Sequence, residues 1–187
     1  MLRVTVTPEQ FSMVKFDHDR IVELAGEVAD KVGLPADREL RIEVDEGNPL
    51  GRVRVTSLEP ITITVEGGAF EDAKRPRSLS DVSVVDVLGR HLFRVRDRLD
   101  PAFGEPPADD KLSLQQAAAW DVYAVGRCDR VGFAPSKPRR LYHFRNRHGF
   151  TDVADEAFEE LWNADSLTWA DVDAVCARTE AARVPVG

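Results

Sequence analysis

The sequence predicts an α+β fold, in which a small mixed or antiparallel sheet is packed by helices and the C-terminal half is helical. Three observations support this prediction. Apolar residues alternate with polar ones in several short segments before residue 66, a period of two that is typical of half-buried strands. From about residue 79 onward the apolar residues recur every three or four positions, as in amphipathic helices. Strands grouped first and helices grouped later favour α+β over an alternating α/β fold.

The chain length and composition fit one folded domain. The 187 residues lie within the usual size of a domain, and 43% of them are hydrophobic, which is enough for a packed core. We therefore predict a single α+β domain over residues 1–180 and a flexible tail over residues 181–187. The alternative is a division into two subdomains near residue 105, where a loop rich in proline and aspartate follows a long helix.

The first half is predicted to contain one strand, one helix and three further strands. Residues 2–6 alternate as a strand, and Asp17 or Asp19 can cap the helix that follows and ends at Gly33. The three later strands are predicted at residues 40–44, 52–56 and 61–65, with Gly67-Gly68 as a turn after the last. Their clean alternation indicates one covered face and one face open to solvent, as in mixed or antiparallel sheets.

The second half is predicted to be a series of helices. The first runs from an N-cap at Ser80 to Asp100-Pro101, and the second starts at Ser113, which fits a capping box with Gln116. The buried side of this second helix is predicted to comprise Leu114, Ala117, Ala118, Val122, Val125 and Cys128. Shorter helices are predicted near residues 153–162 and 168–179, the last with a capping box of Thr168 and Asp171.

Charge and cysteine content restrict the classes of partner and compartment. The formal net charge of −8 disfavours non-specific binding to nucleic acid or anionic membranes. The first residues lack the pattern of a signal peptide, and no apolar stretch is long enough to span a bilayer. Cys128 and Cys176 lie far apart in apolar helical patterns, which favours two reduced and buried thiols over a disulfide or a reactive thiol. These observations predict a cytoplasmic protein.

The most basic stretch of the chain covers residues 137–148, where cationic and aromatic residues are interleaved. Cations that contact phosphate beside rings that stack on a base are typical of nucleic-acid or phosphorylated-ligand sites. The predicted binding residues are Arg139, Arg140, Tyr142, His143, Arg145, Arg147 and His148. Two alternatives remain open. The stretch could bind an acidic protein partner, or it could be structural, with Tyr142 and Phe144 anchoring an extended segment and the arginines paired with acidic residues 152–160.

A second candidate is the helix that carries Gly89-Arg90-His91-Leu92-Phe93-Arg94. Over about the first hundred residues, the order of strand, helix, three strands and this helix resembles the zincin-like metallopeptidase fold. In that family the helix after the sheet carries H-E-x-x-H, whose histidines bind zinc and whose glutamate acts as base. Here Arg90 and Arg94 stand at the histidine positions and His91 at the glutamate position. Guanidinium groups have no lone pair for a metal, so the resemblance implies a zincin-like scaffold without its metal site.

The same helix also has a purely structural interpretation. Asp86, Arg90, Arg94 and Asp97 are spaced three or four residues apart and could form ion pairs on a solvated face. His91 lies on or beside the apolar stripe, where a hydrogen-bonded core histidine is common.

These observations predict a non-catalytic macromolecule-binding protein whose partner is another protein, on a zincin-like scaffold that lacks metal. No catalytic residue, metal ligand or cofactor is predicted, because the chain lacks the glycine-rich phosphate loops and the hydrolase motifs. One alternative is a protein that binds nucleic acid or a phosphorylated ligand through residues 137–148. The other is a hydrolase of unrecognised type that uses His143 and His148. Membrane binding is not expected, and the oligomeric state is not predicted.

Overall fold

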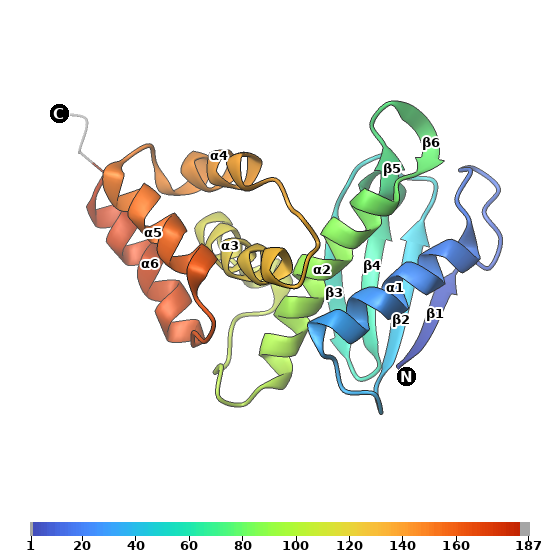
Figure 1. The fold of residues 1–187 in the computed structure, drawn as a ribbon, viewed down its shortest axis with the longest axis horizontal. Coiled ribbons are helices and arrows are strands. Elements are labelled where there is room, and N and C mark those ends of the chain that lie inside the picture. The colour runs from blue at the N-terminus through green and yellow to red at the C-terminus, as the bar shows by residue number, and fades with distance from the viewer. Residues whose placement is uncertain (1, 184–187) are drawn as a thin grey trace. The chain divides into compact units, whose positions relative to one another are not determined.

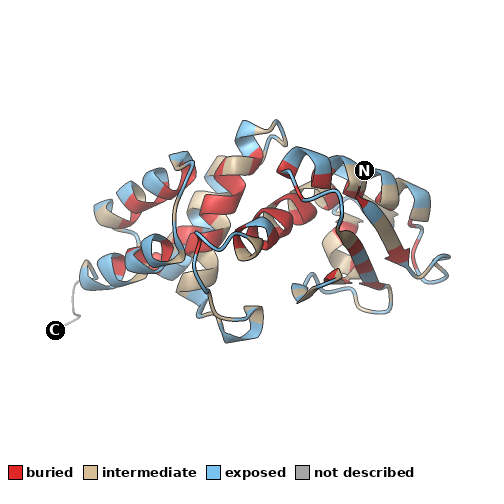
Figure 2. Cartoon of the chain, turned by 90° about the horizontal axis from the view of Figure 1, so that it is seen from below, coloured by how far each residue is buried: buried red, intermediate tan, exposed pale blue. Residues whose placement is uncertain are grey.

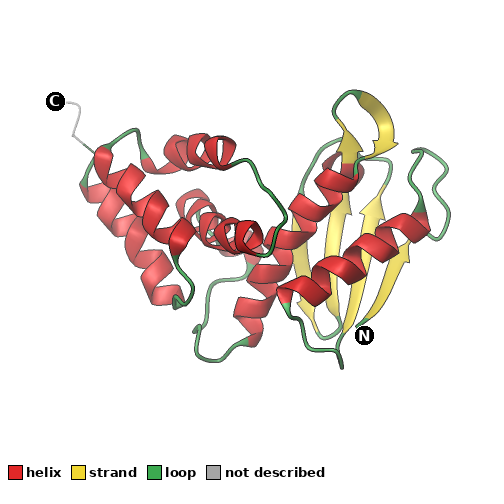
Figure 3. Ribbon diagram, viewed as in Figure 1, coloured by secondary structure: helices red, strands yellow, loops and turns green. Residues whose placement is uncertain are grey.

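The computed structural model describes residues 2–183 and has the predicted α+β architecture (Figure 1). The chain divides into two compact units, Met1–Arg96 (unit 1) and Asp97–Gly187 (unit 2). Unit 1 contains all the strands of the described residues, and unit 2 is helical (Figure 3). The division falls inside helix α2, Asp81–Leu99, and not in the loop near residue 105, because the last turn of α2 packs within unit 2.

A four-stranded mixed sheet forms the base of unit 1, with the strand order β1-β2-β4-β3. The strands are β1 Arg3–Thr7, β2 Glu39–Asp45, β3 Val53–Leu58 and β4 Ile61–Glu66. β1, β2 and β4 run parallel, and β3 runs antiparallel to β4 at one edge. Parallel neighbours need a crossover connection, and helix α1, His18–Val32, provides it between β1 and β2.

One face of this sheet is covered by α1 and by the part of α2 that belongs to unit 1 (Figure 1). Along β2 the buried residues Leu40, Ile42 and Val44 alternate with exposed Arg41 and Glu43. Figure 2, which is coloured by burial, shows buried and exposed positions alternating within the sheet. The core between the two layers is completed by Ile21, Leu24, Val28, Ile61, Ile63, Val65, Val84, Leu88 and Leu92. The predicted alternation of a covered and an open face is therefore confirmed.

The helix ends of unit 1 follow the local sequence signals. The Asp17 side chain caps α1 by accepting a hydrogen bond from the backbone N–H of Arg20 (3.1 Å), and Gly33 ends α1 with φ of +79°. The Ser80 hydroxyl likewise caps α2 by accepting from the backbone N–H of Ser83 (3.1 Å). These N-caps were predicted, because capping depends on residues only a few positions apart.

Loops gather at the carboxyl ends of the three parallel strands. Gly67–Phe70 forms a short 3-10 helix after β4, where the sequence predicted a turn, and β5 Glu71–Asp72 pairs with β6 Arg75–Leu79. The Glu46 carboxylate accepts hydrogen bonds from the backbone N–H (3.0 Å) and hydroxyl (3.0 Å) of Ser12. These bonds fix the loop between β1 and α1 against the end of β2.

In its described residues, unit 2 contains the end of α2 and four further helices around an aromatic core. The helices are α3 Leu114–Arg130, α4 Lys137–His148, α5 Asp152–Asn163 and α6 Trp169–Ala181, preceded by the 3-10 turn Asp109–Lys111. The aromatic side chains buried in this core are Phe103, Trp120, Tyr123, Phe144, Phe158 and Trp162. Both predicted capping boxes, Ser113 with Gln116 and Thr168 with Asp171, are present.

Besides helix α4, which was not predicted, two details of the C-terminal half differ from the sequence-based prediction. Leu114 is 60% exposed, not buried, because the core of unit 2 meets α3 one turn later, at Ala119 and Trp120. The predicted tail over 181–187 begins on structured residues, since Ala181 ends α6 and Ala182 caps it. Residues 184–187 lie outside the described residues.

Cys128 and Cys176 form no disulfide with each other. Cys128 is buried, as predicted, whereas Cys176 is only half-buried, so the predicted burial is wrong for Cys176. Over residues 2–183, no helix combines the length and apolar character needed to cross a membrane.

Candidate functional site

The basic stretch 137–148 forms helix α4 and is not the extended segment considered in one alternative. Pro138 stands in the first turn, where its missing N–H leaves no helical hydrogen bond unmade. Gly149 ends the helix with φ of +98° and donates its N–H to the Arg145 carbonyl (2.8 Å). Between these ends Leu141, Phe144 and His148 recur at helical spacing, and the latter two are fully buried. The helical period thus separates the stretch into a buried and an exposed side.

His148 is buried in the core of unit 2 and does not reach the surface, so the predicted role of this residue in binding is wrong. Its ring is fully buried and stacks on Phe144, with ring centres 4.1 Å apart. Nε2 donates to the Gln115 carbonyl of α3 (2.8 Å), and Nδ1 bonds with the Thr179 hydroxyl of α6 (2.7 Å). Burial lowers the pKa of His148, which favours the neutral ring. The residue therefore ties α4 to two neighbouring helices.

The exposed side of α4 gathers cations and aromatic rings. Arg139, Tyr142, His143 and Arg147 are exposed at spacings that place them on one side of the helix, and Phe150 follows just after it. Tyr142 is 59% and Phe150 66% exposed, and their ring centres lie 6.5 Å apart in an edge arrangement. We call Arg139, Tyr142, His143, Arg147 and Phe150 the α4 surface. His143 and His148 point to different sides of α4, so they do not form a pair.

The acidic helix α5 neutralises part of the basic stretch, as one alternative predicted. Arg145 donates two hydrogen bonds to the carboxylate of Asp155 (2.7 and 2.8 Å), and Lys137 pairs with Glu159 (2.8 Å). The hydrogen bonds from Arg145 lower the pKa of Asp155. Arg140 is half-buried. Within residues 2–183, Arg139 and Arg147 form no ion pair. The uncompensated positive charge of α4 is therefore concentrated on its exposed side.

Helix α2 carries the residues with the zincin-like spacing, and it buries some of the charged residues that were expected to form ion pairs in solvent. Arg94 and Asp97 are 6% exposed, so the predicted solvated ladder of ion pairs is wrong for these two residues. They are buried because α2 is covered on most of its circumference, with Val87, Phe93 and Val95 buried as well.

His91 is also buried, and its Nδ1 lies 2.8 Å from the Val87 carbonyl one turn earlier. Within residues 2–183, no group of three or more His, Cys, Asp or Glu side chains is arranged to hold a metal ion.

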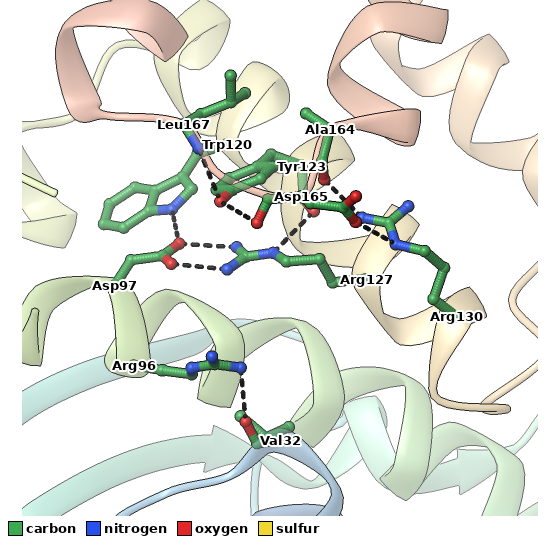
Figure 4. Close-up of polar contacts among 10 residues, drawn as sticks. All are labelled: Val32, Arg96, Asp97, Trp120, Tyr123, Arg127, Arg130, Ala164, Asp165 and Leu167. Atoms are coloured by element: carbon green, nitrogen blue, oxygen red, sulfur yellow. Dashed lines mark hydrogen bonds and ion pairs between the residues drawn. The ribbon is translucent and has the colours of Figure 1, made fainter.

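A polar cluster at the end of α2 was missed by the sequence analysis (Figure 4). The Asp97 carboxylate accepts two hydrogen bonds from the Arg127 guanidinium (both 2.7 Å) and one from Nε1 of Trp120 (2.8 Å). The Arg127 guanidinium also lies 3.7 Å from the centre of the Tyr123 ring. The Tyr123 hydroxyl accepts the N–H of Leu167 (3.1 Å), which holds the loop between α5 and α6. Each polar group has a bonding role, so the cluster stabilises unit 2.

Comparisons with known protein families, with curated proteins and with solved structures found no match to this chain. The candidate site is therefore defined by its own residues, and the α4 surface is the part of the predicted site that remains open to a ligand.

Proposed function

We propose that this protein is a non-catalytic binding protein whose α4 surface binds an acidic segment of another protein. The observation that carries the proposal is the pair of exposed rings, Tyr142 and Phe150, which contact each other. On the same side of α4 lie Arg139 and Arg147, which form no ion pair with any described residue. Tyrosine and arginine are the residues that most often dominate the binding energy of protein interfaces. Exposed aromatic rings that lie together also offer an apolar anchor for a partner side chain.

The distribution of charge favours an acidic protein over a nucleic acid. The net charge of −8 opposes the approach of any anionic partner, and most strongly of a nucleic acid, whose charge density is higher than that of a short acidic segment. Lys137 and Arg145 are already engaged by α5, so few cations remain to follow a phosphate backbone. A short acidic segment with one apolar side chain needs only the two free arginines and the two rings.

Unit 1 and the two cysteines bear on the scaffold and on the cellular location of the protein. We propose that unit 1 is a zincin-like scaffold whose metal site is lost, supported by its element order and by Arg90 and Arg94 at the expected ligand positions. Stoichiometric zinc in the purified protein would contradict this. The two free cysteines, Cys128 and Cys176, support a cytoplasmic location.

A binding titration with matched variants tests the α4 surface. The probe is a fluorescent peptide of aspartate and glutamate with one central leucine, added to the full chain at low salt. Arg139→Glu combined with Arg147→Glu should weaken binding by about tenfold or more, and Tyr142→Ala by about tenfold. Lys111→Glu, an exposed charge reversal elsewhere in unit 2, should change it less than about twofold.

Two outcomes would contradict the proposal. If the variants of the α4 surface bind the peptide as tightly as the unchanged chain, the surface is not the site. If a single-stranded oligonucleotide binds more tightly than the acidic peptide, and the same variants abolish that binding, then the nucleic-acid alternative replaces it.

A further inference from the structure

An open groove runs along the outer edge of β1 in unit 1. β1 lies at the edge of the sheet (Figure 1), and within residues 2–183 it pairs with β2 alone. The groove has a volume of about 370 Å³. It is lined by Val4, Thr5, Val6, Glu9, Gln10, His18 and Val22. These residues come from β1, the loop after it and α1, and none belongs to the α4 surface.

The backbone of β1 points hydrogen-bonding groups into this groove. His18 lines the groove, and its Nε2 donates to the Val6 carbonyl (3.1 Å), which indicates that this carbonyl points away from β2. Residues two apart along a strand direct their backbone groups to the same side. The N–H and carbonyl of Val4 therefore also point outward, where no described strand pairs with them. An added strand would supply partners for these groups.

The groove also has an incompletely covered apolar side. Val4 of β1 and Val22 of α1 are both half-buried, whereas Leu40, the register partner of Val4 on β2, is fully buried. The difference arises because β2 has a neighbouring strand on each side and β1 has one. An apolar side chain carried by an outer strand would cover both valines, and burial of such a side chain is favourable.

The charge at one end of the groove is negative. Glu9 is exposed just beyond the end of β1, and within residues 2–183 it forms no ion pair. Asp19, at the start of α1, lies 2.9 Å from Nδ1 of His18. The Glu9 charge acts on His18, where it contributes, after the hydrogen bond with Asp19, to the raised pKa, but Glu9 forms no ion pair within residues 2–183. An exposed carboxylate of this kind favours a basic side chain in whatever binds there.

We propose that the outer edge of β1 binds an extended segment of a partner protein as a fifth strand. The segment places an apolar side chain on Val4 and Val22 and a basic side chain against Glu9. Main-chain hydrogen bonds with Val4 hold the strand, and the two side-chain contacts set its register. This site is separate from the α4 surface and does not depend on the function proposed for it.

A titration with a designed peptide tests the strand-addition site. The probe is a fluorescent peptide that alternates valine with lysine and threonine, added to the full chain. Val22→Asp should weaken binding by about tenfold, because a carboxylate replaces the apolar contact. Glu9→Lys should weaken it by about fivefold through the lost attraction and the new repulsion. Glu27→Lys, the same charge change at an exposed position of α1 outside the groove, should change it less than about twofold.

A second measurement reports the backbone pairing itself. The Val4 amide should exchange with solvent rapidly in the free chain and at least about tenfold more slowly with bound peptide. A peptide with alternate backbone nitrogens methylated keeps its side chains but loses its donors, and it should not bind.

Three results would overturn the proposal. One is that the designed peptide does not bind, and another is that it binds equally well to the Val22→Asp and Glu9→Lys chains. The third is that the Val4 amide is already protected in the free chain while sedimentation shows a dimer, because a second copy of the chain then occupies this edge. Circular dichroism of each variant confirms that a loss of binding is not a loss of fold.

Discussion

At the scale of single residues, two arginine–aspartate pairs each form two hydrogen bonds but have different surroundings. Arg127 and Asp97 form two hydrogen bonds of 2.7 Å, and their side chains are 11% and 7% exposed. Arg145 and Asp155 form two bonds of 2.8 and 2.7 Å, with side chains 33% and 40% exposed. Burial removes the water that would replace a lost partner, so the buried pair is the more costly one to break.

We expect Asp97→Ala to lower the free energy of unfolding by about 3–5 kcal/mol, because it removes the carboxylate to which both Arg127 and Trp120 donate. Asp155→Ala should lower it by at most about 1 kcal/mol, because solvent can hydrate Arg145. Urea unfolding of the two variants and the unchanged chain gives both values. Equal losses would show that the burial of the Asp97 pair has no energetic consequence.

The same residues show why part of the site was not predictable. The partners of Asp97 lie 23 and 30 residues further along the chain, and no local pattern indicates such a contact. His148 was assigned to the binding surface because the helix around it was not predicted. Given the helix, its spacing of four from Phe144 places both rings on the buried side.

At the scale of secondary-structure elements, features that depend on residues close in sequence were predicted, whereas features that depend on contacts between distant segments were not. The capping residues Ser80, Ser113 and Thr168 were predicted, because each bonds within three residues. The order β1-β2-β4-β3 was not, because it depends on pairing between distant segments. Helix α4 was missed although Pro138 and Gly149 mark its ends, because its only two fully buried residues, Phe144 and His148, make no apolar stripe in the sequence.

Two glycines in the interiors of helices give opposite expectations for the same substitution. A Cβ on Gly126 of α3 would lie 2.8 Å from the Trp162 carbonyl carbon of α5, so the two helix backbones approach closely there. A Cβ on Gly26 of α1 would meet nothing within 4 Å. Alanine fits a helix better than glycine wherever space allows.

We therefore expect Gly126→Ala to destabilise the protein by about 2–3 kcal/mol or more, because the backbones of α3 and α5 must separate. Gly26→Ala should stabilise it by about 0.5–1 kcal/mol. Thermal unfolding of both variants measures the two effects. A neutral Gly126→Ala would show that α3 and α5 shift apart at little cost.

At the scale of the whole molecule, the two units contain histidines with opposite pKa shifts. In unit 1 both ring nitrogens of His18 face acceptors, the Asp19 carboxylate and the Val6 carbonyl. The hydrogen bond with Asp19 is the main cause that raises the pKa of His18 above 6.5. In unit 2 burial is the main cause that lowers the pKa of His148 below 6.5. The sequence predicted a single α+β domain, so it gave no reason to expect two units whose stabilities respond differently to pH.

The sign of each contribution to stability follows from proton uptake. Folded unit 1 holds a proton on His18 that the unfolded chain releases, so this stabilisation is present below about pH 6.5 and is lost as pH rises through the raised pKa. Folded unit 2 excludes a proton from His148 that the unfolded chain accepts. That stabilisation is present above about pH 6.5 and is lost progressively as pH falls from this unfolded value through the lowered pKa of the folded state.

The chain contains three tryptophans, at positions 120, 162 and 169, so tryptophan fluorescence reports unit 2 alone. Its thermal transition should move to lower temperature as pH falls from about 7.5 to about 5.5, because protonation of His148 favours the unfolded chain. In His148→Gln this dependence should flatten, since glutamine can donate to Gln115 but does not titrate. Amide exchange in β2 and β4 reports unit 1, and there His18→Asn should remove a stabilisation present at the lower pH. A tryptophan transition that rises as pH falls, or that keeps its pH dependence in His148→Gln, would show that His148 does not control the pH response of unit 2.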